Sequence, residues 1–392
     1  MLPNPYTPGA GLIPGYLAGR EEMLKKAAES IAAMAQGYPT RSVVYYGLRG
    51  VGKTVLLNKI ESIAEANDVL YEHIEVSERS SFKAAIAFHV QKLMQQTSTK
   101  EQAKSFLHKT FAVLKAFQIT YSPEGEIGFG LKDEIEAAVG VSDTGNFQND
   151  LTELFVALGS LAQKNQRAVC LFIDEIQYLK EEEFEALIAA VHRCNQKGLP
   201  LALFGAGLPK VTKMAGDIKS YAERLFSFVS VDSLQEEAAW LALTEPAKVL
   251  GVSYTKDAVK KIVQVTRGYP YFIQEYGKQV WEFRTKQEIS LSAVDAAYAA
   301  FEKSIDDSFF KVRYDRATPK EKTFMLAMAE CEALPCTMSQ IALKMESNVQ
   351  SLSPVRNQLI HKGFIYSAGA GEVDFTVPQF KGYLMRRRNA LE

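Results

Sequence analysis

Cysteine and proline are scarce in this chain. Of its 392 residues, four are cysteine and 14 are proline. Four cysteines are too few to form a disulfide framework in a chain of this length. Only Cys331 and Cys336 lie near each other, and no histidine accompanies them, so we expect no zinc site. Hydrophobic residues make up 47% of the chain, so most of it can bury a core and little of it should be disordered.

A dominant charge and a long apolar run are also missing. The 45 Lys and Arg residues nearly balance the 46 Asp and Glu residues, which leaves a formal charge of -1. The whole molecule therefore does not attract nucleic acid or an acidic membrane, and any such binding must come from a local patch. No run approaches 18 uninterrupted apolar residues, and no basic segment followed by an apolar one begins the chain. We expect a cytoplasmic protein without a membrane partner.

The length predicts two or three domains, and the first large region alternates strands with helices. Residues 1–19 are rich in proline and glycine and should form an irregular arm. Runs typical of strands occupy 42–46, 69–76, 168–173 and 200–205. Helical patterns occupy 21–36, 55–65, 81–118, 147–164 and 181–196. This alternation predicts a parallel sheet covered on both faces, and a Pro-Glu-Gly turn suggests a hairpin at 118–130.

After about residue 233 the strands stop. Amphipathic helices are predicted at 235–250, 256–266, 270–284 and 292–308. A last unit begins at Thr318-Pro319, where threonine is a good N-cap and proline suits the first helical turn. Helices at 337–345 and 348–362 and β-like runs at 363–367 and 372–377 complete it. The order helix, helix, helix, hairpin is that of a winged helix-turn-helix.

A glycine-rich loop joins the first strand to the next helix. Residues 47–54 read G-L-R-G-V-G-K-T and fit the phosphate-loop pattern G-x-x-x-x-G-K-[ST]. Backbone N–H groups of such a loop surround phosphate oxygens, and the helix N-terminus adds partial positive charge. Lys53 would reach the β- and γ-phosphates, and the Thr54 hydroxyl would bind Mg²⁺. The predicted nucleotide-binding residues of this segment are Gly47, Arg49, Gly50, Val51, Gly52, Lys53, Thr54 and Val55.

An acidic pair follows the apolar strand at 168–173. Asp174 would bind Mg²⁺ through its water shell, and Glu175 could act as the general base that activates the attacking water. A pair of acids points to an ATPase that hydrolyses ATP rather than to a kinase. A GTPase is disfavoured, because the only candidate guanine motif, Asn58-Lys59, lies inside the helix after the loop.

Two further segments extend these motifs into a family resemblance. Residues 19–24, G-R-E-E-M-L, resemble the GRE box of the initiator-like (origin-recognition-like) AAA+ ATPases and of the related STAND ATPases. Residues 268–270, G-Y-P, resemble the GxP turn that opens a lid helix in these families. The resemblance implies that Gly19 and Arg20 lie near the adenine, and that Tyr269 and Pro270 lie near the nucleotide.

The resemblance covers nearly the whole chain and implies an α/β P-loop NTPase with a parallel sheet, a helical lid and a C-terminal winged helix-turn-helix domain. The expected parts are an N-terminal arm and helix (1–40), an ATPase core (41–231), a lid (232–310) and a winged helix (311–392). The implied cofactors are ATP or ADP and Mg²⁺, and the chain would be a monomer or a nucleotide-dependent oligomer.

Three positions bear on the rate of hydrolysis. The strand after the acidic pair usually ends in a polar sensor, but residues 205–207 are G-A-G, so slow hydrolysis is expected. The resemblance places an arginine finger at Arg224, which would act on its own site or a neighbour's; the alternative is an exposed arginine paired with an acid. Arg267, just before the GxP turn, is a candidate lid sensor.

The C-terminal region carries a local basic shift. Residues 311–392 hold 12 Lys or Arg against 8 Asp or Glu. A basic winged helix suits contact with double-stranded DNA, through a recognition helix at 351–362 and a basic run near the end of the chain. The candidate contacts are Arg356, Asn357, His361, Lys362, Arg386, Arg387 and Arg388. Two functions stay open: ATP-dependent control of DNA binding, or a STAND-like signalling ATPase whose winged helix docks on protein.

Overall fold

A computed structural model describes residues 2–78, 80–98, 104–121, 140–218, 222–285 and 287–389. The chain forms two compact units. The sheet unit comprises Arg20–Gly47 and Lys53–Val231. The helical unit comprises Met1–Gly19, Leu48–Gly52 and Asp232–Glu392.

The sheet unit is built on five parallel strands in the order β2-β3-β4-β1-β5. The strands are β1 (Ser42–Tyr46), β2 (Leu70–Glu75), β3 (Val169–Asp174), β4 (Leu201–Gly207) and β5 (Phe226–Ser230). Every residue of β3 and β4 is buried. Their near-continuous apolar sequences fit strands that are covered on both faces. The predicted parallel α/β sheet is therefore confirmed.

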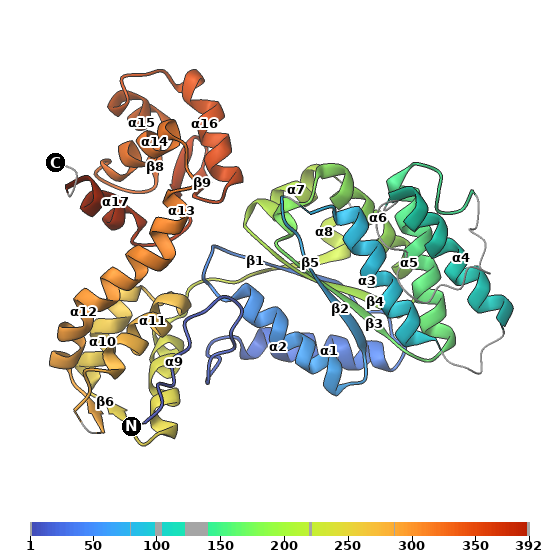
Figure 1. Ribbon diagram of the computed structural model, residues 1–392, viewed down its shortest axis with the longest axis horizontal. Helices are drawn as coiled ribbons and strands as arrows, with labels where there is room; N and C mark the ends of the chain where they lie inside the picture. Colours follow the sequence, from blue (N-terminus) through green and yellow to red (C-terminus); the bar gives the residue numbers. More distant parts are fainter. Residues whose placement is uncertain are drawn as a thin grey trace. The chain divides into compact units, whose positions relative to one another are not determined.

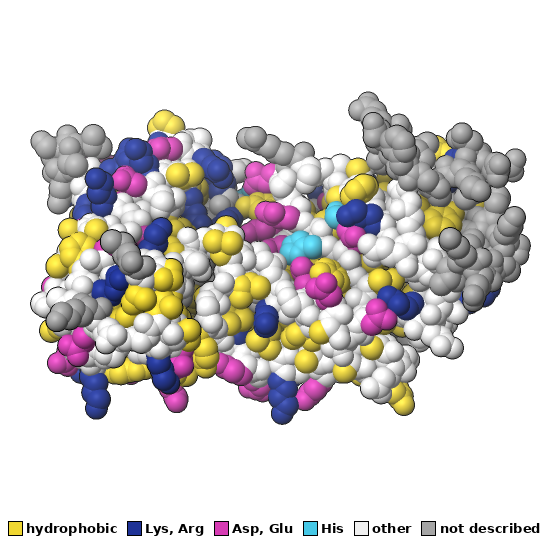
Figure 2. Space-filling model, turned by 60° about the horizontal axis from the view of Figure 1, so that its bottom comes forward, with side chains coloured by type: hydrophobic (Ala, Val, Ile, Leu, Met, Phe, Trp, Pro, Cys, Tyr) yellow, Lys and Arg dark blue, Asp and Glu magenta, His cyan; other side chains and the backbone are white. Residues whose placement is uncertain are grey.

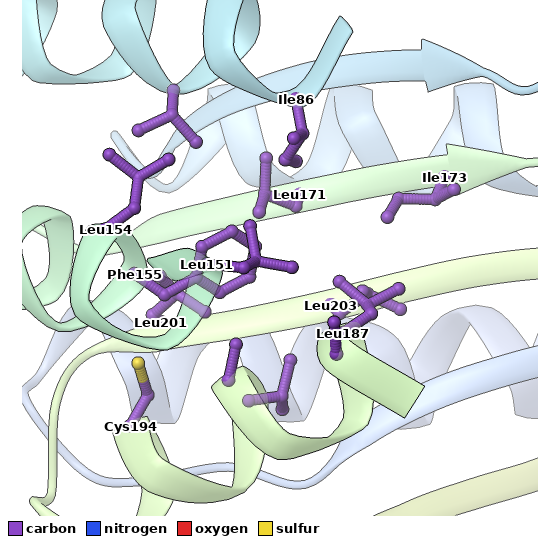
Figure 3. Close-up of a cluster of buried hydrophobic side chains, with 14 of the residues drawn as sticks. Ile86, Leu151, Leu154, Phe155, Leu171, Ile173, Leu187, Cys194, Leu201 and Leu203 are labelled. Carbon is purple, nitrogen blue, oxygen red and sulfur yellow. The ribbon is translucent and has the colours of Figure 1, made fainter. Parts of the chain in front are cut away.

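Helices cover both faces of this sheet (Figure 1). One face carries α3 (Phe82–Thr97), α5 (Phe147–Lys164) and α6 (Glu181–Gln196). Alternate residues of β3 and β4 point into this layer and meet apolar side chains of the three helices (Figure 3). The other face carries α2 (Lys53–Ala66) with α1 (Glu21–Ala35) packed against it. Because successive strand residues point to opposite faces, each strand contributes to both cores.

The segment predicted as a hairpin begins as a helix. The structure places 118–121 in the last turn of α4 (Lys104–Tyr121), where Phe117 and Gln118 are buried. The Gln118 side chain donates a 2.8 Å hydrogen bond to Gln91 of α3, which favours helix over strand at this point. The hairpin prediction is wrong for these residues, and 122–130 lie outside the described residues. The sheet unit also contains α7 (Lys210–Ile218) and α8 (Ala222–Leu225).

After Asp232, the described residues of the helical unit form four helices and a short strand pair before residue 306. The helices are α9 (Glu236–Val249), α10 (Lys256–Thr266), α11 (Pro270–Trp281) and α12 (Leu291–Ile305). Strands β6 (Ser253–Tyr254) and β7 (Glu288–Ile289) pair in parallel, so the expectation that strands end near 233 is wrong. The Tyr276 and Phe301 rings stack 4.3 Å apart between α11 and α12. A π-helical turn, η2 (Asp306–Lys311), and the short helix α13 (Val312–Tyr314) continue the chain.

The N-terminal arm is irregular, as predicted, and it is anchored by aromatic packing. Tyr6 is 3% exposed and meets Trp281 edge to face at 6.1 Å. Its hydroxyl donates a 2.6 Å hydrogen bond to the carbonyl oxygen of Leu243.

The last part of the helical unit contains α14 (Pro319–Ala329), β8 (Cys336–Thr337), α15 (Met338–Lys344), α16 (Val349–His361), β9 (Ile365–Gly369), β10 (Glu372–Phe375) and α17 (Phe380–Asn389). The three strands form an antiparallel sheet in the order β8-β10-β9. Thr318 caps α14, and Glu321 completes the capping box. Three helices and a hairpin thus follow each other in the predicted order, while α17 was not anticipated. Among the described residues, no helix has the length and apolar character to cross a bilayer.

Candidate nucleotide-binding site

The predicted phosphate loop has the backbone that its glycines permit. The chain leaves β1 at Tyr46, and the Gly47 N–H donates a 3.1 Å hydrogen bond to the carbonyl oxygen of Gly207. Gly50 and Gly52 have φ angles of +81° and +92°. These left-handed conformations favour glycine. Helix α2 then begins at Lys53, so strand, glycine turn and helix follow each other as predicted.

Lys53 lies inside the loop. Its side chain is 9% exposed, and Nζ donates a 3.0 Å hydrogen bond to the carbonyl oxygen of Gly47. A carbonyl is a neutral acceptor, whereas a phosphate oxygen carries charge and forms a stronger hydrogen bond with an ammonium group. Lys53 is therefore placed to exchange the carbonyl for a phosphate oxygen.

A hydrogen bond joins Thr54, near the start of α2, to Asp174, at the end of β3. The Thr54 hydroxyl donates a 2.6 Å hydrogen bond to Oδ2 of Asp174, whose side chain is almost fully buried at the end of β3. The other oxygen, Oδ1, accepts a 2.7 Å hydrogen bond from the backbone N–H of Glu175. Hydroxyl and carboxylate oxygens are the ligands that Mg²⁺ prefers, together with water and phosphate. This pair of oxygen donors fits the predicted metal position.

Glu175 is held by a residue that the sequence analysis did not single out. Glu175 has a φ of 56°, in the left-handed region, and its Oε2 accepts a hydrogen bond from the side-chain amide of Gln177. Gln177 is 2% exposed, and its Oε1 accepts a 2.8 Å hydrogen bond from the N–H of Leu208. The only sign of this contact in the sequence is that a glutamine, Gln177, follows Glu175 by two positions.

A histidine lies among acids of the sheet unit. His73 of β2 contacts Glu61 of α2 through Nδ1. Burial opposes its charged form, but the hydrogen bond to Glu61 and the charges of Glu61 and Asp174 raise the pKa of His73 overall.

The G-Y-P turn of the helical unit packs on the phosphate loop. Gly268 has a φ of +70°, and a Cβ there would lie 2.2 Å from the carbonyl oxygen of Leu234. Pro270 begins α11, directly after Tyr269. The Tyr269 hydroxyl donates a hydrogen bond to the carbonyl oxygen of Arg49 and lies 3.1 Å from that of Thr376. One tyrosine therefore touches both the loop and the C-terminal elements of the same unit.

The other residues predicted to contact the nucleotide are Gly19, Arg20, Val51 and Val55. Gly19 has a φ of +66°, and Arg20 is buried directly before α1. In the loop and the helix that follows it, Val51 is buried and Val55 is half-buried.

The predicted arginine finger, Arg224, and the candidate lid sensor, Arg267, differ in their surroundings. Arg224 lies in the short helix α8, one residue before its end, and is exposed. Arg267 follows α10 in a left-handed conformation and acts electrostatically on Asp374 of β10. Burial raises the pKa of Asp374, while the Phe375 N–H and the Arg267 charge oppose this rise. Arg267 thus interacts electrostatically with a strand of the C-terminal elements.

Most cations predicted to touch DNA are in contact with groups of the chain itself. Lys362 forms a 2.8 Å ion pair with Glu321 of α14. Arg386 binds Asp306 at 2.6 Å and Glu302 at 3.0 Å, and Arg388 binds Glu330 at 2.7 Å. The other contacts are those of Arg387 with the ring of Tyr314 and the hydroxyl of Tyr383, and those of Arg356 with Ser367 and Asn357. Asn357 and His361 are exposed on α16.

Models of two protein families match parts of the chain. Residues 16–204 match the model of the AAA ATPase domain family, and residues 307–384 match a family described as Domain of unknown function (DUF8462). No curated protein matches the chain.

Among solved structures, the chain is similar to a Walker-type ATPase of Pyrococcus abyssi at 16% identity and a TM-score of 0.57, with 94% of this chain and 96% of that chain covered. It also matches the ORC1 protein of Aeropyrum pernix in complex with DNA, at 16% identity and a TM-score of 0.49 over 96% and 95% of the two chains. The RuvB Holliday junction branch migration motor of Thermotoga maritima matches at 16% identity and a TM-score of 0.45 over 94% and 95%. The likeness to the Walker-type ATPase, at a TM-score of 0.57, supports a shared fold. The sheet, the phosphate loop and the match over residues 16–204 together support an AAA+ P-loop ATPase domain.

Proposed function

We propose that this chain binds ATP with Mg²⁺, hydrolyses it slowly, and uses the nucleotide state to control its C-terminal domain, which we interpret as a winged helix. The observation that carries the proposal is the contact between Thr54 and Asp174 at 2.6 Å, next to the phosphate loop. It joins the hydroxyl that follows Lys53 to the acid that ends β3, the two groups that a nucleotide-bound Mg²⁺ requires.

The phosphate loop would hold the nucleotide by its backbone N–H groups, with Lys53 on the terminal phosphates. Thr54 and Asp174 would hold Mg²⁺, Gly19 and Arg20 would lie near the adenine, and Tyr269 and Pro270 would lie near the nucleotide. Bound Mg²⁺ supplies charge neutralisation at the phosphates. Glu175 orients the attacking water and accepts its proton.

Tyr269 supports a route from the loop to the C-terminal domain. Its hydroxyl carries one proton, yet it lies within hydrogen-bond distance of two carbonyl oxygens, those of Arg49 and Thr376. The two acceptors compete for that proton. A nucleotide that shifts the backbone at Arg49 therefore changes the hydrogen bond available to Thr376, directly after β10.

Substitution of Tyr269 by phenylalanine tests this route. The ring packing stays and the hydroxyl is lost, so we expect MgATP to bind with an affinity within about threefold of wild type. Hydrogen–deuterium exchange of residues 372–379 should respond to MgATP in the wild type but not in Tyr269→Phe. The control is Tyr271→Phe, which removes a neighbouring hydroxyl and should leave the response intact. An unchanged response in Tyr269→Phe would contradict the route.

Arg224 is proposed as the arginine finger, and its exposed position leaves it accessible to a second chain. We expect Arg224→Ala to lower kcat at least about tenfold while MgATP affinity is kept, because a finger stabilises charge that develops in the transition state. If Arg224 acts on a neighbour's site, the specific activity of the wild type rises with protein concentration; if it acts on its own, it does not. A variant with unchanged kcat would mean that Arg224 is only a surface residue.

The C-terminal domain has two candidate partners. The order of its elements and its excess of Lys and Arg, several of which gather over these elements in Figure 2, support DNA binding. A specific observation favours protein instead: Lys362, Arg386 and Arg388 already form ion pairs with acids of the same unit. On α16, which is described throughout, the exposed side chains are Gln350, Ser351, Pro354, Asn357, Gln358 and His361, and none is Lys or Arg.

A salt series separates the two partners. If this domain binds duplex DNA through phosphates, log K falls linearly with log salt, by roughly 0.9 for each phosphate contacted. Because Lys362, Arg386 and Arg388 already pair with acids, we expect a shallow slope of about two or less, or no DNA binding, in a fluorescence polarisation titration. A steep slope that decreases in Arg386→Ala and Arg388→Ala would instead support DNA as the partner, because it would mean that these ion pairs open on binding.

A further inference from the structure

Two glycines at the end of β4 lie against the turn that follows Asp174 and Glu175. A Cβ on Gly205 would lie 2.2 Å from Cδ1 of Ile176, and a Cβ on Gly207 would lie 3.0 Å from Oε1 of Gln177 and 2.6 Å from Cγ2 of Val211. A distance below 3.0 Å requires the neighbour to move, and one of 3.0 Å is tight. Gly205 therefore leaves the space that Ile176 occupies, and Gly207 leaves the space of Val211 and room for the Gln177 amide.

The Gln177 amide is fixed at both of its ends. Its oxygen accepts the Leu208 N–H at 2.8 Å, and its nitrogen donates to the Glu175 carboxylate. Because a nitrogen cannot accept the Leu208 hydrogen, this arrangement also defines which end of the amide faces Glu175. Gln177 lies in the single-turn helix η1 (Ile176–Tyr178) and is 2% exposed, so its side chain has little freedom to rotate.

The consequence concerns Glu175. Its own backbone is in the left-handed region, and Oε2 is the oxygen engaged by Gln177, which leaves Oε1 as the oxygen available to water. A general base must be held within a small range of orientations to be effective.

We propose that Gln177 is a positioning residue that orients the Glu175 carboxylate toward the attacking water and connects it to the end of β4. This inference rests on the proposed ATP hydrolysis. Gln177 acts through Glu175 and does not itself touch the nucleotide.

Gln177→Glu is the decisive variant. Its oxygen can still accept the Leu208 N–H, but the amide donor that faces Glu175 is replaced by a carboxylate oxygen. With phosphate release measured under saturating MgATP, we expect kcat to fall at least about tenfold while the calorimetric Kd for MgATP stays within about twofold. Gln196→Glu, at an exposed position of α6, adds the same charge and should leave kcat unchanged. Gln177→Met, which removes both hydrogen bonds, should lose kcat to a similar extent and keeps the test valid if the glutamate variant fails to fold.

A double-mutant cycle distinguishes positioning from a merely structural role. In single-turnover measurements on a Glu175→Gln background, Gln177→Glu should change the residual rate by less than about twofold, because its effect passes through the carboxylate. A kcat within twofold of wild type in Gln177→Glu, or an equal loss on both backgrounds, would overturn the inference. A wild type that binds MgATP but never turns it over would overturn both the inference and the proposed hydrolysis, whereas normal turnover with unaffected Gln177 variants would overturn the inference alone.

Discussion

Lys53→Ala should lose MgATP binding by about 100-fold or more. The buried ammonium group is the side chain that the loop presents for the terminal phosphates, and it is removed together with its charge. Charge-assisted hydrogen bonds are worth about 1.5–3 kcal/mol, and each 1.4 kcal/mol changes the dissociation constant about tenfold. Isothermal titration calorimetry of the purified chain with MgATP measures the loss.

Lys59→Ala is the matched control for Lys53→Ala. Lys59 lies on the same helix, α2, and is exposed, so its removal changes the net charge equally without touching the loop. Its Kd should stay within about twofold of wild type. If Lys53→Ala keeps its affinity for MgATP, and its thermal unfolding curve matches that of Lys59→Ala, then ATP does not bind at this loop.

Glu175→Gln should bind MgATP and hardly hydrolyse it. The amide keeps the size of the side chain and can still accept the hydrogen bond from Gln177, but it cannot take a proton from water. Loss of a general base lowers kcat by about 100-fold to 10,000-fold. Steady-state phosphate release gives kcat, and calorimetry on the same sample shows that the affinity is kept.

Glu181→Gln provides the comparison for Glu175→Gln. Glu181 is an exposed acid at the start of α6, outside the proposed site, so its turnover should match wild type. If Glu175→Gln turns ATP over at the wild-type rate, the water is activated by another group and the assignment of Glu175 as base is wrong.

Features that depend on neighbouring residues could be predicted from the sequence. Strand, glycine turn and helix follow one another at residues 42–66, and the apolar run before Asp174 forms a buried strand. The strand order could not be predicted, because β4 lies between β1 and β3 although it follows both in the chain. Pairing between distant segments is not encoded in any local pattern. A local pattern also failed at residues 118–121, which were predicted to begin a hairpin but form the last turn of α4.

What the sequence analysis missed depends on contacts between distant residues. Gln177 is significant because of Leu208, 31 positions away. Tyr269 was predicted near the nucleotide, but its contact with Thr376, 107 positions away, was not. The basic residues near the C-terminus were counted as available for DNA, yet Arg386 pairs with Asp306 across 80 positions. A count of Lys and Arg in a segment predicts a basic surface patch only when it is known which of these residues pair with acids.

The most direct test of the central claim is an experimental structure of the intact chain with Mg²⁺ and a non-hydrolysable ATP analogue. We predict that the triphosphate lies on the backbone N–H groups of the phosphate loop and that Lys53 Nζ leaves the Gly47 carbonyl for a phosphate oxygen. Mg²⁺ should lie beside Thr54 and Asp174, which now share a 2.6 Å hydrogen bond. A nucleotide bound elsewhere, or Lys53 still on Gly47 with the analogue present, would contradict the account.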